Sequence, residues 1–329
     1  MIVMKNSLSL YVTVRHGDRT PFVSETYPKH IYNNVSYGGY GPGELTDEGR
    51  RRMYQFGQQL KRMYKNSFRS NFTISNVKAV STEYNRTKHS LQLVLNGLFD
   101  EDETYDLFSL PNELCPRYQQ TYIEYQKSEE GKKLINKYSE KFSYISEHTG
   151  SEISCIEDLV PIYHSLKSDK EFGLELPTWS LSVQRYLKSA MGDLFESYVA
   201  LPELNKLFGG MLLKEILNNI DAHIETPKNE KFYLYSCHDL HIAGLLGAMD
   251  IFRSHTPDYA ACVVIELHKI STAYYVKGNG ILASQGQKIE TQLSVMDNKK
   301  LPAVTYLFDV ISRLKKNFKK SLFLNGMPI

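Results

Sequence analysis

The sequence has few cysteines, no long apolar run and almost no net charge. Its four cysteines show no Cys-x-x-Cys spacing, which argues against a structural zinc site, and any disulfide pairing stays unassigned. No apolar run reaches about 18 residues, so we predict no membrane span. The net charge of +2 argues against binding to nucleic acid, because that requires a concentrated basic surface. Any affinity for anions must therefore be local.

Repeats, low-complexity tracts and extended linkers are also missing. The 329 residues suffice for one large domain or two smaller ones, and 42% hydrophobic residues is a typical globular fraction. Residues 1–14 make a poor signal peptide because their apolar part continues directly into Arg15, so we interpret them as the first strand. Sequons begin at Asn34, Asn71 and Asn85, and they leave the compartment open.

The most informative feature is the run Arg-His-Gly-Asp-Arg-Thr-Pro at residues 15–21. It places His16 between Arg15 and Arg19 where a predicted strand gives way to a loop. A chain of this length would contain such a match by chance about once in ten thousand cases. A cluster of guanidiniums and an imidazole is costly to pack unless an anion belongs there.

Two further polar clusters follow predicted strands. His238 and Asp239 come after the apolar run 232–235, and Arg86 follows a short predicted strand at 78–81. In open α/β sheets, ligands bind beyond the carboxyl ends of the strands, where several loops converge. We therefore expect the three clusters to meet in space.

The hydrophobic pattern predicts an α/β core interrupted by a helical region. Residues 46–64 and 86–98 read as helices, with Thr46 as the N-cap of the first. Residues 106–204 are polar and mostly helical in pattern, for example at 129–148 and 179–199, with Pro161 and Pro177 as breaks. The core is expected to resume with a helix at 211–220, strands at 231–236, 259–267 and 273–276, and a closing helix at 302–315. We predict an α/β core at 1–105 and 205–329 and an inserted helical cap domain at 106–204.

Together the clusters have the composition of a phosphate site. Planar guanidiniums match a tetrahedral oxyanion, and three of them would repel one another unless a dianion neutralised them. A neutral imidazole can attack phosphorus, and Asp239 can protonate the leaving oxygen if its pKa is high enough. Arginines can stabilise the equatorial oxygens, so we expect no metal and no cofactor.

Taken singly, several of these residues have plainer explanations. A lone arginine such as Arg86 is more often structural, and a His-Asp dipeptide can simply begin a helix. We interpret His89, His164 and His241 as surface or core histidines rather than ligands. The motif at 15–21 is too improbable by chance for such an explanation. Its presence strengthens the functional interpretation of the other two clusters.

The chain resembles the histidine acid phosphatases of the histidine phosphatase superfamily. Residues 15–21 match the Arg-His-Gly-x-Arg-x-Pro signature, and His238 and Asp239 match the distal His-Asp pair. The likeness to prostatic-type members continues at residues 44–49, 115–118, 176–179, 209–212 and 257–262. It departs from the family at Leu240 and His241, where threonine or asparagine is common, and Cys155 stands away from the usual position.

The resemblance implies a fold, a reaction and a set of residues. The fold is a three-layer α/β/α core around a mixed, phosphoglycerate mutase-like sheet, with a helical cap domain. His16 is implied as nucleophile and Asp239 as proton donor. The residues implied to clamp the phosphate are Arg15, Arg19, Arg86 and His238. Relatives are commonly homodimers, and are secreted or lysosomal.

The expected function is that of a phosphoric monoester hydrolase, an acid phosphatase of broad specificity that acts on small phosphomonoesters through a phosphohistidine. A phosphoglycerate-mutase-type phosphotransferase is the main alternative. The His-Asp pair and the large insertion favour hydrolysis. A non-catalytic phosphate-binding homologue is a third possibility, but no key residue is missing.

Overall fold

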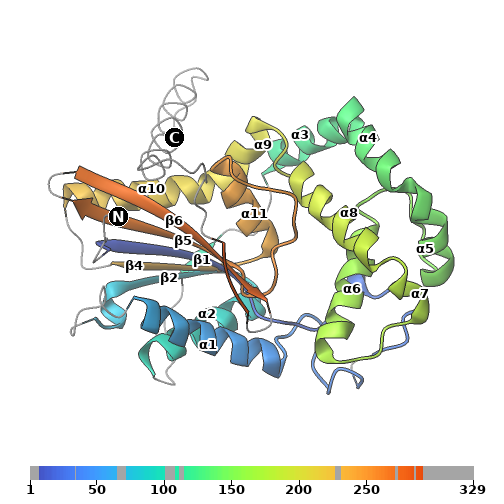
Figure 1. The fold of residues 1–329 in the computed structure, drawn as a ribbon, viewed down its shortest axis with the longest axis horizontal. Coiled ribbons are helices and arrows are strands. Elements are labelled where there is room, and N and C mark those ends of the chain that lie inside the picture. Colours follow the sequence, from blue (N-terminus) through green and yellow to red (C-terminus); the bar gives the residue numbers. More distant parts are fainter. Residues whose placement is uncertain are drawn as a thin grey trace.

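A seven-stranded mixed sheet forms the centre of the α/β part (Figure 1). The computed structural model describes residues 7–33, 35–64, 72–100, 108–110, 115–226, 231–270, 273–284 and 287–291. The strands are β1 Ser9–Arg15, β2 Val77–Thr82, β3 Phe108–Leu110, β4 Phe232–Cys237, β5 Cys262–Ile270, β6 Ala273–Ser284 and β7 Gln287–Thr291. Their order is β3-β2-β4-β1-β5-β6-β7, parallel from β3 to β1 and antiparallel from β1 to β7. The predicted mixed sheet is confirmed.

Helices cover both faces of this sheet (Figure 1). α1, Asp47–Met63, and α2, Asn85–Phe99, lie on one face, and α10, Gly209–Glu225, and α11, Asp239–Ala248, lie on the other. Side chains of β1 alternate between the two faces, because Leu10, Val12 and Val14 pack with α1 and α2 while Tyr11 packs with α10 and α11. The α/β/α layering follows from that alternation.

The start of α1 and its crossing with α2 each depend on particular residues. Thr46 caps α1 and its hydroxyl accepts a hydrogen bond from Gly49 N at 3.1 Å. Asp47 and Glu48 lie in the first turn, where the helix dipole favours acids. The two helices cross closely through Gly57 and Gly97, since a Cβ at either would overlap a backbone carbonyl of the other helix.

A mainly helical region lies beside the α/β part (Figure 1). Its helices are α3 Pro116–Lys127, α4 Glu129–Tyr138, α5 Phe142–Thr149, α6 Leu159–Phe172, α7 Thr178–Leu181, α8 Gln184–Ser197 and α9 Pro202–Leu207. It has its own hydrophobic cluster, which includes Ile145, Ile162 and Leu194. The sheet nevertheless extends past the predicted core boundary at residue 105, because β3 pairs with β2.

Two long helices predicted in this region are each divided. The 3₁₀ turn η3, Ser139–Lys141, separates α4 from α5, and a break at Ser182 separates α7 from α8. In both places a serine hydroxyl donates to the carbonyl three residues earlier, Ser139 to Asn136 at 3.0 Å and Ser182 to Trp179 at 3.0 Å. Such bonds compete with the helical ladder.

Other local expectations are also corrected. Pro161 does not break a helix, since it is the third residue of α6, where a missing N–H costs nothing. β5 begins at Cys262 rather than at 259, and β6 continues to Ser284 rather than ending at 276. The helix predicted at 302–315 and the sequons at Asn34 and Asn71 lie outside the described residues.

The four cysteines Cys115, Cys155, Cys237 and Cys262 are free thiols. Within the described ranges, no helix combines the length and apolar character needed to cross a bilayer.

Candidate active site

The carboxyl ends of β1, β2 and β4 bring the three predicted clusters to one edge of the sheet. Arg15 is in register with Cys237, and His16 N donates to Cys237 O at 3.0 Å. Arg86 follows β2 in the first turn of α2, and its Nη2 lies 3.1 Å from Nδ1 of His238. Because parallel strands end at the same edge, residues more than 200 positions apart become neighbours.

His16 is buried and held in one tautomer. Its Nδ1 lies 2.8 Å from the carbonyl oxygen of Gly17, which can only accept, so Nδ1 carries the proton and Nε2 keeps a free lone pair. Burial, followed by the charges of Arg86 and Arg15, holds the pKa of His16 well below its usual value. Glycine is required at position 17, because a Cβ there would lie only 2.6 Å from Gly49 O. The imidazole is therefore neutral even in acid.

Arg15 and Asp239 form an ion pair beside this imidazole. Arg15 Nη2 lies 2.7 Å from Asp239 Oδ2, Nη1 donates to Pro257 O at 2.5 Å, and the guanidinium lies 4.3 Å from the centroid of the Tyr259 ring. Burial alone would raise the pKa of Asp239, but Arg15, with weaker effects of His164 and His238, lowers it below its usual range. Asp239 is thus ionised while Arg15 holds it.

Arg19 is held by a carboxylate that the sequence analysis missed. Its Nη1 and Nη2 each lie 2.6 Å from one carboxylate oxygen of Glu25, at the end of the short helix η1, Val23–Glu25. Burial raises the pKa of Glu25, and the paired Arg19 outweighs that effect and lowers it. The only sequence signal for Glu25 was its position six residues after Arg19, in a turn after the motif.

Arg86 lies between two aromatic rings. Its guanidinium is 4.2 Å from the centroid of Tyr84 and 4.8 Å from that of Phe22. Phe22 also lies 4.6 Å from the guanidinium of Arg19, so this ring joins the two arginines. Burial and the charge of Arg19 lower the pKa of Arg86 to about 10.

His238 is engaged by the protein at both ring nitrogens. Nδ1 accepts from Arg86, which can only donate, so Nε2 carries the proton and donates to Thr82 Oγ1 at 3.0 Å. Burial and Arg86 lower the pKa of His238 to about 2, which keeps the ring neutral. In this arrangement His238 orients Arg86. All six predicted residues thus lie in one cluster.

One of the three histidines interpreted as core or surface residues, His164, is buried in the helical region. His164 of α6 is only 7% exposed, and burial, opposed by the charge of Asp239, lowers its pKa to about 4. His241 is half-buried and lies 5.4 Å from His238 between ring centroids, whereas His89 is exposed.

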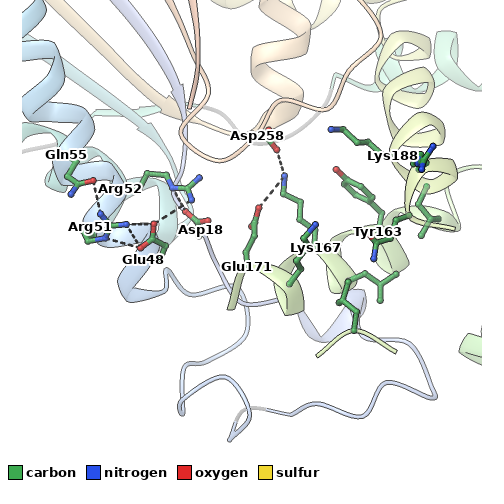
Figure 2. Close-up of a pocket in the computed structure, with 16 residues that line it drawn as sticks. Asp18, Glu48, Arg51, Arg52, Gln55, Tyr163, Lys167, Glu171, Lys188 and Asp258 are labelled. Atoms are coloured by element: carbon green, nitrogen blue, oxygen red, sulfur yellow. Dashed lines mark hydrogen bonds and ion pairs between the residues drawn. The ribbon is translucent and has the colours of Figure 1, made fainter. Parts of the chain in front are cut away.

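A separate cavity of about 1030 Å³ opens between α1 and the helices α6 and α8 (Figure 2). None of the six predicted residues lines it, but Asp18 of the motif does. Its charged residues include Asp18, Glu48, Arg52, Lys167, Glu171, Lys188 and Asp258. Tyr259 connects the cavity with the site, since its ring centroid lies 5.1 Å from Lys167 Nζ and 4.3 Å from the Arg15 guanidinium.

No group of three or more His, Cys, Asp or Glu side chains within the described ranges is arranged to hold a metal ion. The site instead combines a neutral imidazole with three arginines, which suits an anion with several oxygens.

Comparison with known proteins finds a family and several relatives for this chain. Residues 9–278 match the family model of the histidine phosphatase superfamily (branch 2). The venom acid phosphatase Acph-1 of Apis mellifera is 33% identical over 312 residues, covering 86% of this chain and 79% of its own. The human prostatic acid phosphatase is 26% identical over 307 residues, covering 84% and 78%.

The fold has solved counterparts as well. The phytase from Citrobacter braakii superposes with a TM-score of 0.68 at 14% identity, covering 94% of this chain and 98% of its own. The Hafnia alvei phytase in complex with tartrate gives the same TM-score at 12% identity, over 95% and 98%. At these identities the likeness concerns the fold alone. Sequence and fold together place this chain in the histidine phosphatase superfamily, branch 2.

Proposed function

We propose that this protein is an acid phosphatase that hydrolyses small phosphate monoesters through a phosphohistidine on Nε2 of His16. The observation that carries the proposal is the hydrogen bond from Nδ1 to Gly17 O, which leaves Nε2 free among three arginines. The relatives named acid phosphatase, from bee venom and from human tissues, support the same reaction class.

In the first step, Nε2 of His16 attacks phosphorus and the bond from phosphorus to the ester oxygen breaks. Arg15, Arg19 and Arg86 would stabilise the equatorial oxygens of the transferred group. His238 would hold Arg86 in place through its Nδ1. Asp239 would give its proton to the leaving oxygen, so the alcohol departs neutral.

Asp239 must gain a proton before it can act as this acid. A phosphate dianion that engages Arg15 weakens the ion pair with Asp239 and adds negative charge beside its carboxylate. Both changes raise the pKa of Asp239. Substrate binding in acid medium would thereby protonate Asp239, and the first step uses that proton.

In the second step, water attacks the phosphohistidine, the bond from phosphorus to Nε2 breaks, and the carboxylate of Asp239 takes the proton of that water. Inorganic phosphate leaves, and His16 and Asp239 return to their starting states. Because the lowered pKa of His16 keeps it neutral in acid, the nucleophile stays available where Asp239 can hold its proton. This combination favours an acidic optimum.

The cap and the breadth of specificity belong to the same proposal. We propose that the helices between β3 and α10 form a cap over the site, inserted into the α/β core as the sequence suggested. A site that contacts the phosphoryl group from all sides makes few contacts with the alcohol part of the ester. This favours broad specificity. The homodimer implied by the family resemblance remains a prediction.

Trapping the intermediate tests the mechanism. We expect that ³²P-labelled ester, quenched in alkali during turnover and followed by digestion, labels the peptide that contains His16. His16→Ala should lose label and phosphate release by at least 10³-fold while its Tm stays within about 2 °C of wild type. Label elsewhere would overturn the nucleophile assignment, and mutase turnover without phosphate release would favour the phosphotransferase alternative.

Metal removal provides an independent prediction. Since guanidiniums supply the positive charge at the phosphoryl oxygens, we expect full activity in excess EDTA. The measurement is phosphate release from p-nitrophenyl phosphate before and after chelation. A loss that returns on adding a divalent cation would contradict the arginine-based mechanism.

A further inference from the structure

Tyr259 is held beside the nucleophile by contacts of its ring and of its backbone. Its ring centroid lies 5.7 Å from that of His16 and 4.3 Å from the Arg15 guanidinium. The segment that carries Tyr259 is bonded to the backbone of the motif, because Ala260 N donates to His16 O at 3.2 Å and Arg15 N donates to Ala261 O at 2.9 Å. The ring is therefore fixed against the carboxyl end of β1.

The backbone next to this tyrosine is strained. Ala260 is buried and has a φ of 57°, in the left-handed region that an alanine rarely adopts. Such a conformation persists only where the surrounding contacts enforce it, and it is found most often at functional sites. The position of Tyr259 is thus maintained at an energetic cost.

The hydroxyl of Tyr259 is buried without a hydrogen-bond partner among the residues that the structure describes. Tyr64, another buried tyrosine, instead donates its hydroxyl hydrogen to Glu266 Oε1 at 3.1 Å. A buried hydroxyl that forms no hydrogen bond is costly, so a structural role does not explain why residue 259 is a tyrosine rather than a phenylalanine.

Three other buried donors of the site are in the same condition. The Nε atoms of Arg15, Arg19 and Arg86 also have no hydrogen-bond partner within the described part of the chain. A guanidinium N–H can only donate, so these groups require acceptors from elsewhere. The site therefore has more buried donors than the protein provides acceptors for, which suits an anion with several oxygens.

The hydroxyl of Tyr259 keeps its proton and can donate it to a hydrogen bond. Burial raises the pKa of Tyr259, and the charges of Arg19 and Arg15 oppose this effect without overcoming it. The hydroxyl is therefore neutral in acid and at neutral pH.

We propose that the Tyr259 hydroxyl is a further phosphate-binding group, which donates a hydrogen bond to a non-bridging oxygen of the phosphoryl group that His16 receives. The inference deepens the proposed phosphatase function and rests on it. A hydrogen bond to a charged oxygen is stronger than one between neutral groups. The same phosphoryl oxygens are present in the ester, in the transition state and in the phosphohistidine, so this donor serves both steps.

Removal of the hydroxyl alone tests the proposal. Tyr259→Phe keeps the ring on Arg15 and loses only the donor, so we expect kcat/KM to fall about 10-fold or more. The factor should be the same for p-nitrophenyl phosphate and for glycerol 2-phosphate, because the lost contact is to the transferred group and not to the leaving group. Inhibition by vanadate, which adopts the five-coordinate geometry of phosphoryl transfer, should weaken by a similar factor.

Tyr64→Phe is the matched control. The partner of Tyr64, Glu266, pairs with Leu10 near the start of β1, at the end away from the site. Its hydroxyl forms a structural hydrogen bond, so we expect Tyr64→Phe to lower Tm by about 2 °C or more and to leave kcat/KM within about 2-fold of wild type. Tyr259→Phe should show the opposite pattern, with a Tm no lower than that of wild type, because its hydroxyl has no bond to the described residues to lose.

Three results would overturn the inference. They are a fall in kcat/KM of less than about 3-fold in Tyr259→Phe, a loss confined to one of the two esters, and a loss of Tm like that of Tyr64→Phe, which would reveal a structural partner. Label on the residue 16 peptide in wild type does not depend on Tyr259, so the phosphatase proposal would survive each of these results. Label on another peptide would overturn the proposed function, and this inference with it.

Discussion

At the residue scale, side chains of the protein already balance part of the positive charge of the site. The sequence suggested that three arginines would repel one another without a dianion. In the structure Arg15 pairs with Asp239, Arg19 pairs with Glu25, and Arg86 lies between aromatic rings. Two carboxylates that neutralise two of the three guanidiniums help the buried cluster to fold, and a bound phosphate would compete with them for the same donors.

Glu25 provides a residue-scale prediction. Glu25→Gln removes the charge that orients both terminal nitrogens of the buried Arg19, so we expect kcat/KM for p-nitrophenyl phosphate to fall about 10-fold, or about 1.4 kcal/mol. Steady-state kinetics with inorganic phosphate as inhibitor measure the effect. Glu83→Gln is the control, because Glu83 is exposed and pairs with Lys88 at 3.0 Å. Equal activity of the two variants would contradict a positioning role for Glu25.

At the scale of helices and strands, close approach between neighbouring elements positions the motif. Gly17 lies against the backbone of Gly49 in the first turn of α1, so the loop that carries His16 is packed directly on that helix. Further along, α1 and α2 approach through Gly57 and Gly97. A hydrogen bond also connects the motif loop to α2, because Gly17 N donates to Ser90 Oγ at 3.1 Å.

The crossing of α1 and α2 can be tested. A Cβ in Gly57→Ala would overlap the carbonyl of Val94, and the helices would have to separate, so we expect a loss of about 1–3 kcal/mol in the free energy of unfolding. Denaturant titration measures it. Arg62→Ala, on the exposed side of the same helix, should change stability by less than about 0.5 kcal/mol. A neutral Gly57→Ala would show that the crossing tolerates a methyl group.

At the scale of the whole molecule, partly exposed charges connect the helical region to the core. Lys167 of α6 pairs with Asp258 of the core at 2.5 Å and lies 3.7 Å from Glu171 (Figure 2). Burial raises the pKa of Glu171 to about 7, with Lys167 opposing and Asp18 adding to the effect. The region between the two parts is therefore sensitive to pH.

This sensitivity predicts a stability profile. The pKa of Glu171 is about 7 in the folded state and about 4.3 in the unfolded state, so the folded state binds the proton more tightly. Its contribution to stability is full below about pH 4.3 and is lost as pH rises towards 7. We expect Glu171→Gln to reduce the fall in Tm between pH 4.5 and pH 7 by at least about 2 °C.

Thermal melts of wild type and Glu171→Gln at the two pH values measure that difference. Glu152→Gln, a change at an exposed glutamate of the helical region, should leave the pH dependence of Tm unaltered. An identical slope in wild type and Glu171→Gln would mean that Glu171 titrates alike in both states.

Much of the fold was readable from local patterns. An apolar stretch predicted β1, and helical spacing with a capping threonine predicted α1, because these signals depend on residues close in the chain. The helical pattern at 129–148 and 179–199 did not reveal the breaks inside these ranges, since periodicity does not register a serine hydroxyl that competes for a backbone carbonyl. The strand β3 was missed because three residues carry too little pattern.

The sequence alone determined which residues could do the chemistry, since an imidazole among arginines is improbable by chance and useful mainly to a phosphate. Only the tertiary structure decided which partners hold them: Glu25 on Arg19, Thr82 on His238, and Arg15 on Asp239. These partners come from separate strands, loops and helices, and their meeting depends on how the sheet brings its strand ends together. Electrostatics follows that placement, so the protonation states of the site are a property of the fold.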